Sequence, residues 1–403
     1  MQHDVLHEVK QNIQVNFNYS VLFTKNAFSR ENTILAKVFA NTDSNDNATF
    51  VESTAFEEHI KQTKVLVVID DNVVKKHTDL ITQLKSYALA HKIDLVRAPL
   101  IVPGGEQVKK DLSHLDTIYQ LVADEKIDRH SYILAIGGGA VLDAIGYAAA
   151  TAHRGVRLVR MPTTVLAQND AGVGVKTGAN YIGRKNYLGA FAPPFAVIND
   201  FDLLSTLTLR DKRAGIAEAI KVALIKDQAF FDNLYQNRKK LADFEDEAMQ
   251  YMIIRCAELH LSHIQNSGDP FEMGSARPLD FGHWSAHKLE ELSSYELRHG
   301  EAVAIGIAMD TLYSYRQNMI SKAMCDQVIT LLIDLGFDLS HRVLAQLHVK
   351  SALEEFREHL GGNLCITLLT SLGSAREVNQ IDCSVMQECV DYLLQPNTNH
   401  LFA

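Results

Sequence analysis

The sequence predicts a two-domain protein: an α/β domain with a doubly wound, mainly parallel sheet, followed by a mainly α-helical domain. Two observations predict this architecture. Over the first 200 residues, short continuous apolar runs alternate with segments of helical periodicity, which is typical of a parallel sheet covered by helices. After about residue 204, helical periodicity dominates and strand patterns become rare. We therefore place one domain at residues 1–203 and the second at residues 204–403.

The first domain is predicted from four segments with the length of buried strands, at 65–69, 95–102, 132–136 and 158–161, of which 65–69 and 132–136 are apolar throughout. Strands of a parallel sheet are apolar throughout because helices cover both of its faces. Helical patterns follow the first three runs, over 73–92, 112–123 and 140–152. Ligands of such sheets bind at the carboxyl ends of the strands, so polar residues just after each strand are candidates for a site.

The second domain is predicted to consist of helices, with a single clear strand at 364–370. The helical patterns cover residues 208–234, 245–268, 283–293, 301–317, 319–335 and 342–360. Ligand sites occur preferentially where domains meet, so we expect the site in the cleft between the two.

Composition excludes several classes of function. The chain carries 39 Lys and Arg against 49 Asp and Glu, a net charge of −10, which argues against nucleic acid as a partner. No apolar run has the length of about 18 residues that a membrane-spanning helix needs, and the first ten residues do not form a secretory signal. Five cysteines without CxxC spacing indicate reduced thiols. These features predict a cytoplasmic protein without membrane partners.

The glycine run 137–139 lies between a predicted strand and a predicted helix. Glycines at such a junction let backbone N–H groups approach a pyrophosphate, and the helix N-terminus favours its negative charge. Asp70 and Asn72 follow the first strand, where they could bind an adenosine ribose. A tight turn without a ligand is the alternative, because the run is neither GxGxxG nor a Walker loop.

A second polar segment follows the strand at 158–161. Lys176, Lys185 and Asn186 lie in a glycine-rich stretch that we expect to be a loop. Two lysines and an amide suit a phosphate monoester. The alternative is a polar surface loop without a ligand.

The second domain contains candidate metal ligands. His283 and His287 are spaced i, i+4 and share one helical face, Glu218 lies on an earlier helix, and His299 begins a later one. One Glu and two His form a sound zinc set that leaves room for water or substrate oxygens. Ordinary polar or capping histidines are the alternative, because the chain has 17 His and accidental pairs are expected.

Together these segments resemble the sugar-phosphate cyclases, the superfamily of 3-dehydroquinate synthase. The sequence looks closest to the dehydroquinate synthase-like cyclases of bacterial ebo gene clusters and to sedoheptulose 7-phosphate cyclases. Six blocks in matching order carry the resemblance: residues 137–155, 162–178, 183–191, 213–221, 280–287 and 298–306. The resemblance implies a dehydroquinate synthase-like fold, with an NAD-binding first domain and a metal-binding second domain.

The resemblance also implies roles for single residues. It implies an NAD site made by Asp70, Asn72, Glu106, Lys109, Gly138, Gly139, Asp143, Thr163 and Thr164. It implies zinc, or alternatively cobalt, on Glu218, His283 and His299. It implies catalytic roles for Asp170, Lys176, Lys221 and His287, and substrate contacts for Lys185 and Asn186. Arg154 matches an arginine that reaches the phosphate in a neighbouring subunit, which implies a homodimer.

The implied reaction is that of a carbon–oxygen lyase acting on a sugar phosphate. It comprises transient NAD-dependent oxidation of a secondary alcohol, elimination of phosphate, return of the hydride, and an intramolecular aldol closure that yields a carbocycle. The cofactor is regenerated in each turnover. The protein mainly has to hold one substrate in place through several steps.

The sequence departs from dehydroquinate synthase where that family binds the substrate carboxylate. His260 stands at the lysine position, Arg277 is one residue away from the arginine position, and Asp280 replaces an asparagine. The segment 356–362, which contains Arg357, looks like that of cyclases acting on sedoheptulose 7-phosphate. A neutral seven-carbon ketose phosphate is therefore the expected substrate.

Three alternatives remain at this point. Retention of His287 agrees with 3-dehydroquinate synthase itself, which acts on a keto-acid phosphate. A metal-dependent alcohol or glycerol dehydrogenase would share the two-domain plan but would not need the phosphate-binding residues. A non-catalytic protein could keep the fold, although all the expected metal ligands are present.

Overall fold

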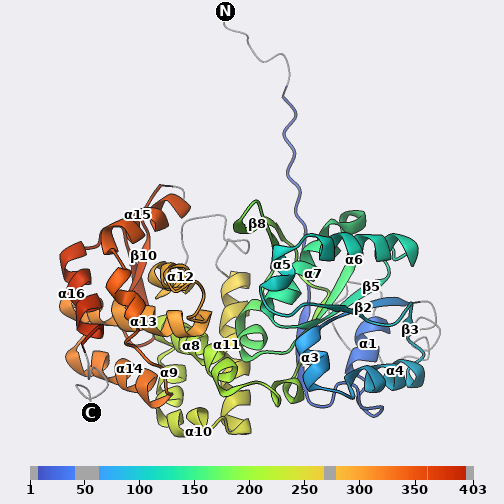
Figure 1. Cartoon of the computed structure of the whole chain (residues 1–403), viewed down its shortest axis with the longest axis horizontal. Coiled ribbons are helices and arrows are strands. Elements are labelled where there is room, and N and C mark those ends of the chain that lie inside the picture. Colours follow the sequence, from blue (N-terminus) through green and yellow to red (C-terminus); the bar gives the residue numbers. More distant parts are fainter. Residues whose placement is uncertain (1–7, 41–62, 267–277, 361, 396–403) are drawn as a thin grey trace, which may run out of the picture.

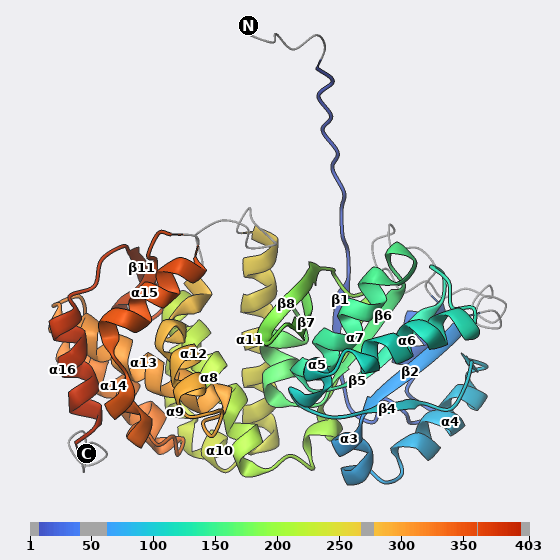
Figure 2. The ribbon, with the colours of Figure 1, turned by 45° about the horizontal axis from the view of Figure 1, so that its top comes forward.

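The computed structural model describes residues 8–40, 63–266, 278–360 and 362–395. The described chain forms two lobes, one built around a sheet and one built from helices (Figure 1). In both views the long helix α11, Asp246–Asn266, lies between the sheet and the remaining helices (Figure 2). Residues 8–18 are exposed and extend away from the sheet lobe without helix or strand structure.

The first lobe contains a seven-stranded sheet whose pairings are all parallel. Its order is β1-β9-β6-β5-β2-β3, and β4 also pairs with β2. The strands are β1 Ser20–Thr24, β2 Lys64–Asp70, β3 Asp94–Leu95, β4 Leu100–Val102, β5 Tyr132–Gly137, β6 Arg157–Pro162 and β9 Ala196–Asp200. The predicted fold class is confirmed.

Helices cover both faces of this sheet, which explains its continuous apolar strands. Val65, Val67 and Ile69 of β2 pack into one buried cluster, while Leu66 and Val68 pack into another. Alternate side chains of a strand point to opposite faces, so both faces must be apolar. The flanking helices are α1 Ile34–Ala40, α3 Asp71–Lys76, α4 Leu80–Ala90, α5 Gln107–Lys110, α6 Ser113–Asp124 and α7 Gly139–Thr151.

Two elements of this lobe were predicted too long. The expected helix 73–92 is interrupted between α3 and α4, where the His77 ring contacts the Leu203 carbonyl at 3.3 Å and the Thr206 hydroxyl at 2.9 Å. The expected strand 95–102 is split into β3 and β4, and Pro99, which has no N–H to donate, lies between them. Strands β1 and β9 were not predicted.

The expected loop around Lys176 and Lys185 is in fact an antiparallel hairpin. Its strands are β7 Lys176–Tyr181 and β8 Arg184–Phe191. Ile182 and Gly183 both have positive φ, at 46° and 74°, and form the two-residue turn. Such turns match the twist of the flanking strands, so they favour hairpins. The prediction failed because two of the glycines in this stretch, Gly178 and Gly189, lie within the strands.

The second lobe packs its helices around α13, His299–Arg316, whose residues 302–314 are all buried. A helix that is apolar on every side is stable only in the middle of a lobe. The other helices are α8 Leu209–Lys226, α9 Gln228–Gln236, α10 Arg238–Ala242, α12 His283–Leu292, α14 Lys322–Asp334, α15 Val349–His359 and α16 Cys383–Leu393. Strands β10 Ile366–Ser371 and β11 Ser374–Val378 form a small antiparallel pair.

Two predicted helices of this lobe are broken. The expected helix 208–234 divides at Asp227, whose carboxylate accepts hydrogen bonds from the Phe230 N–H at 3.0 Å and from Arg255 at 2.7 Å. The expected helix 342–360 begins as a short 3₁₀ turn, Arg342–Gln346, before α15. Among the described helices, none is long and apolar enough to cross a membrane. The boundary between residues 203 and 204 stays a prediction.

Candidate functional site

The carboxyl ends of three neighbouring strands bring the predicted cofactor residues to one edge of the sheet. β2 pairs with β5, and β5 pairs with β6, all in parallel. Asp70 and Asn72 follow β2, Gly138 and Gly139 follow β5, and Thr163 and Thr164 follow β6. This edge is where doubly wound sheets bind their ligands.

The glycine run at the start of α7 is closely packed, and the lack of side chains leaves its backbone N–H groups accessible to an anion. A Cβ on Gly137 would lie 2.8 Å from the Val141 side chain, and one on Gly138 would lie 3.3 Å from Thr164. The first N–H groups of a helix have no intrahelical partner, so the start of α7 can bind a pyrophosphate. The carboxylate of Asp70 accepts the Asn72 N–H at 2.8 Å. Burial raises the pKa of Asp70, and the bond from Asn72 opposes that rise.

A buried lysine joins this edge to the β7–β8 hairpin. Lys109 Nζ lies 2.6 Å from Asp143 Oδ2 and donates to Asn186 Oδ1 at 2.8 Å. Lys185 lies 3.8 Å from the Glu106 carboxylate. Two separate sets of contacts, one centred on Lys109 and one between Lys185 and Glu106, therefore hold the hairpin beside the cofactor edge.

A short π-helical turn, Ala167–Ala171, carries Asp170 and packs against α11 and α8 of the helical lobe. Asp170 Oδ1 lies 2.8 Å from His260 Nδ1 on α11. The neighbouring Asn169 donates to the Gly215 carbonyl of α8 at 2.8 Å, which also ties the turn to the helical lobe. Burial alone would raise the pKa of Asp170, but His260 lowers it below its usual value.

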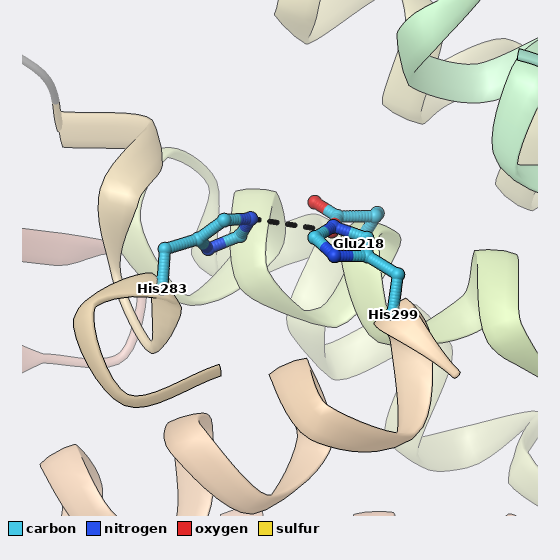
Figure 3. A group of neighbouring side chains, drawn as sticks. All are labelled: Glu218, His283 and His299. Carbon is cyan, nitrogen blue, oxygen red and sulfur yellow. Dashed lines mark ion pairs between the residues drawn. The ribbon is translucent and has the colours of Figure 1, made fainter. Parts of the chain in front are cut away.

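Three side chains from three helices of the second lobe converge (Figure 3). Glu218 comes from α8, while His283 and His299 are the first residues of α12 and α13. Glu218 Oε1 lies 3.5 Å from His283 Nε2 and 3.2 Å from His299 Nε2. All three offer a ligand atom within 4.8 Å of the others.

The donor chemistry of this group fits a divalent metal such as zinc. Glu218 is fully buried, and among the described residues neither of its carboxylate oxygens has a hydrogen bond of normal geometry, although Lys221 forms an ion pair with it. Burial alone would raise the pKa of Glu218, but Lys221 and His283 hold it well below its usual range. An ionised carboxylate beside two imidazoles is a set that Zn²⁺ or Co²⁺ accepts.

The remaining ring nitrogens of both histidines have acceptors. His283 Nδ1 lies 3.1 Å from the Phe281 carbonyl, and His299 Nδ1 lies 3.2 Å from Glu290 Oε2. Burial by itself lowers the pKa of His299, but hydrogen bonds to Glu218 and Glu290 raise it to about 9. Each Nε2 is thereby turned toward Glu218.

Lys221 and His287 are two further polar residues beside the Glu218 group. Burial alone would lower the pKa of Lys221, but the carboxylates of Glu218, Asp170 and Asp280 raise it. The His287 ring lies 5.6 Å from that of His283. Desolvation, together with the charges of the neighbouring histidines, lowers the pKa of His287, so its imidazole is neutral.

Other predicted residues lie outside this cluster or beyond the described chain. Arg154 is exposed in a left-handed turn, with φ 64°, at the opposite end of α7 from Gly138. Arg357 is exposed on α15 and pairs with Glu354 on the same helix. Lys176 begins β7, and its carbonyl accepts from Arg160 at 3.3 Å. Arg277 lies outside the described residues.

Two residues near the site were missed by sequence reasoning. Arg160 of β6 is fully buried and donates to the carbonyls of Gly172, Gly174 and Lys176, so it holds the segment that follows Asp170. Glu290 contacts His299. A signal for Glu290 was present, because positions 283, 287 and 290 share one face of a helix.

Comparison with known proteins agrees with this architecture. Residues 99–214 match the family model described as 3-dehydroquinate synthase N-terminal, and residues 215–359 match 3-dehydroquinate synthase C-terminal. A 3-dehydroquinate synthase of Blochmanniella pennsylvanica is 34% identical over 79% of this chain and 87% of its own length.

Two solved structures are similar over nearly the whole chain. ValA, a 2-epi-5-epi-valiolone synthase from Streptomyces hygroscopicus with NAD⁺ and Zn²⁺ bound, superposes with a TM-score of 0.81 at 26% identity, covering 96% of this chain and 99% of ValA. A 2-deoxy-scyllo-inosose synthase complexed with carbaglucose-6-phosphate, NAD⁺ and Co²⁺ has a TM-score of 0.67 at 22% identity, covering 92% and 95%.

A parallel-sheet lobe followed by a helical lobe is the architecture of the dehydroquinate synthase-like sugar-phosphate cyclases. With both family models matched in order, the chain belongs to the 3-dehydroquinate synthase family.

Proposed function

We propose that this protein is an NAD- and zinc-dependent sugar-phosphate cyclase whose substrate is a neutral seven-carbon ketose phosphate, such as sedoheptulose 7-phosphate. Cobalt would suit the same ligand set. The observation that carries the choice of substrate is the pairing of His260 with Asp170 at 2.8 Å. The position at which the family resemblance expects a carboxylate-binding lysine is thus held by a histidine that already has an anionic partner.

The charges around Lys221 support the same choice. Glu218, Asp170 and Asp280 all act on this single lysine, so carboxylates outnumber ammonium groups in this part of the cleft. A substrate carboxylate placed here would be repelled, because charges a few ångströms apart interact strongly in a partly buried site. Hydroxyl groups can donate hydrogen bonds to the same carboxylates, which favours a polyol.

The cofactor residues of this proposal lie along the strand ends. The start of α7 would hold the pyrophosphate, and Asp70 and Asn72 the ribose. When bound, NAD and the metal supply hydride transfer and polarisation of substrate oxygens. The remaining residues of the proposed NAD site are Thr163, Thr164, Glu106, Lys109 and Asp143.

The remaining residues bind and orient the sugar phosphate. Lys176, Lys185 and Asn186, on the β7–β8 hairpin, would hold the phosphate. Asp170 and Lys221 would orient the hydroxyl groups, and the neutral imidazole of His287 can accept or donate a proton. Their main contribution is to keep one substrate in place through several steps.

We further propose that the enzyme is a homodimer in which Arg154 reaches the neighbouring site. Arg154 is exposed, and α7, 13 residues long, separates it from Gly138 of its own chain. At 1.5 Å per residue this helix spans about 20 Å, too far for one side chain to cross. The five cysteines are free thiols, which supports a reducing, cytoplasmic location.

3-Dehydroquinate synthase activity is the second candidate, favoured by the name of the relative that is 34% identical. A metal-dependent alcohol or glycerol dehydrogenase is a weaker third candidate, since it would leave the two hairpin lysines without a purpose. It would also accumulate NADH, whereas a cyclase regenerates its cofactor.

The deciding experiment is phosphate release by the purified protein loaded with NAD and zinc. Sedoheptulose 7-phosphate is compared with the keto-acid phosphate of dehydroquinate synthase, while absorbance at the NADH band is followed. Release from the first substrate without NADH accumulation supports the proposal. Release only from the second makes the protein a dehydroquinate synthase, and NADH accumulation with a simple alcohol makes it a dehydrogenase.

A further inference from the structure

The two histidines of the Glu218 group are held by different kinds of acceptor. His283 Nδ1 faces a backbone carbonyl, that of Phe281, at 3.1 Å. His299 Nδ1 faces a carboxylate oxygen, Oε2 of Glu290, at 3.2 Å. A histidine that binds a metal through Nε2 carries its proton on Nδ1, so each of these acceptors selects the metal-binding tautomer.

Glu290 is built into the site and is not a mobile surface carboxylate. Only 6% of it is exposed, and it lies on α12 two turns after His283. Helices α12 and α13 pack against each other, which brings Glu290 to the first residue of α13. The Glu290 carboxylate therefore contacts the His299 ring from a buried position that two packed helices determine.

We propose that Glu290 is a positioning residue that orients His299 toward the metal and strengthens the bond that His299 makes to it. This inference rests on the proposed metal-dependent function. A carboxylate acceptor fixes the tautomer and the ring orientation, and it makes the opposite nitrogen a better donor to the metal. A backbone carbonyl does the same more weakly, so the two histidines are unequal ligands.

The affinity of the metal-free protein for Zn²⁺, measured by competition with a chromophoric chelator, tests this directly. Loss of such an outer carboxylate typically weakens metal binding about 10- to 100-fold. We expect that loss for Glu290→Ala and a smaller one for Glu290→Gln, whose amide oxygen still accepts from Nδ1. Glu291→Gln is the matched control, because Glu291 is adjacent, exposed and paired only with Lys288 among the described residues.

Co²⁺ loading gives a second readout that helix packing alone would not change. The visible absorption of bound Co²⁺ reports ligand geometry, so we expect Glu290→Ala to shift it and Glu291→Gln to leave it unchanged. If Glu290→Ala fails to fold, the Zn²⁺ affinity and the Co²⁺ spectrum of Glu290→Gln test the inference instead. Wild-type affinity and spectrum in folded Glu290 variants would overturn the inference. Complete loss of metal in Glu290→Gln would also overturn it, because Glu290 would then be a direct ligand.

Two further variants separate this inference from the proposed function. Glu218→Gln and His283→Ala are expected to lose the metal. If they do so while the Glu290 variants bind normally, only the positioning role fails. If they bind Zn²⁺ as tightly as the wild type, the metal group itself, and with it the proposed function, is wrong.

Discussion

His260 Nδ1 on α11 lies 2.8 Å from Asp170 Oδ1 on the π-helical turn of the sheet lobe, so a direct contact between these two side chains joins the two lobes. The Nε2 atom of the same ring would lie 3.4 Å from a Cβ placed on Gly174. His260 therefore lies between Asp170 and Gly174. In the proposed function, this histidine contributes to the choice of substrate.

His260→Ala removes the imidazole that lies 2.8 Å from the Asp170 carboxylate. A charge-assisted hydrogen bond contributes about 1.5–3 kcal/mol, so we expect kcat/KM for sedoheptulose 7-phosphate to fall about 10- to 100-fold. Glu258→Gln, an exposed change on the same helix, should leave it unchanged. His260→Lys should raise activity toward the keto-acid phosphate. If the ratio of kcat/KM for the two substrates is the same in His260→Lys as in the wild type, position 260 does not determine substrate choice.

Glu218→Ala and His283→Ala should each abolish turnover, because each removes one of three protein ligands from the metal group. Steady-state assays should be paired with circular dichroism, since Glu218 is fully buried and its loss removes the ion-pair partner of the buried Lys221. Full activity in either folded variant would refute the metal assignment.

Lys176→Ala should act mainly on substrate binding. If Lys176 holds the phosphate, KM should rise about 10- to 100-fold while kcat changes less, since a charged hydrogen bond is lost equally from ground and transition states. Lys350→Ala on α15 serves as a charge-matched control. The same KM in both variants would exclude Lys176 from the phosphate site.

Asp310 on α13 should make stability depend on pH. This buried carboxylate accepts the Gly282 N–H at 2.9 Å and the Trp284 indole N–H at 2.8 Å. Burial raises its pKa to about 7, against 3.8 for the ordinary group. The folded state thus binds a proton that the unfolded chain releases between these values, so stability falls as pH rises from about 4 to 7.

Denaturant unfolding across this pH range measures the effect of Asp310. Asp310→Asn cannot ionise, so the difference in unfolding free energy between wild type and variant should shrink as pH rises. The change amounts to about 1.4 kcal/mol for each unit of pKa shift. A difference that is constant over pH 4–8 would show that Asp310 is not the titrating group.

Gly306→Ala tests the contact between α13 and the start of α12. A Cβ at this position would overlap the Gly282 carbonyl oxygen and lie 2.9 Å from Ser285 Oγ. Alanine normally stabilises a helix interior by about 0.5–1 kcal/mol relative to glycine. Here we expect the opposite, a loss of about 1–3 kcal/mol from overpacking, with weaker Zn²⁺ binding because His283 follows Gly282 directly. Higher stability in the variant would contradict the close contact.

Much of the fold could be predicted from local pattern. Continuous apolar runs identified β2, β5 and β6 because a strand covered on both faces has no polar side chains to place. Helical periodicity identified α11, α12 and α13 closely. The broken helices were missed because their interruptions depend on distant partners, such as the carbonyl of Leu203 for His77.

For the candidate site, too, some features could be predicted from the sequence and others could not. Local sequence pattern was enough to identify the site's residues: the glycine run, the hairpin lysines, and Glu218, His283 and His299. Their contacts could be known only from the folded chain. His260 meets Asp170, and Glu290 meets His299, because packing of α11 on the π-helical turn and of α12 on α13 brings them within hydrogen-bonding distance. Periodicity shows which face of a helix a side chain occupies, but the packing of whole elements determines what that face touches.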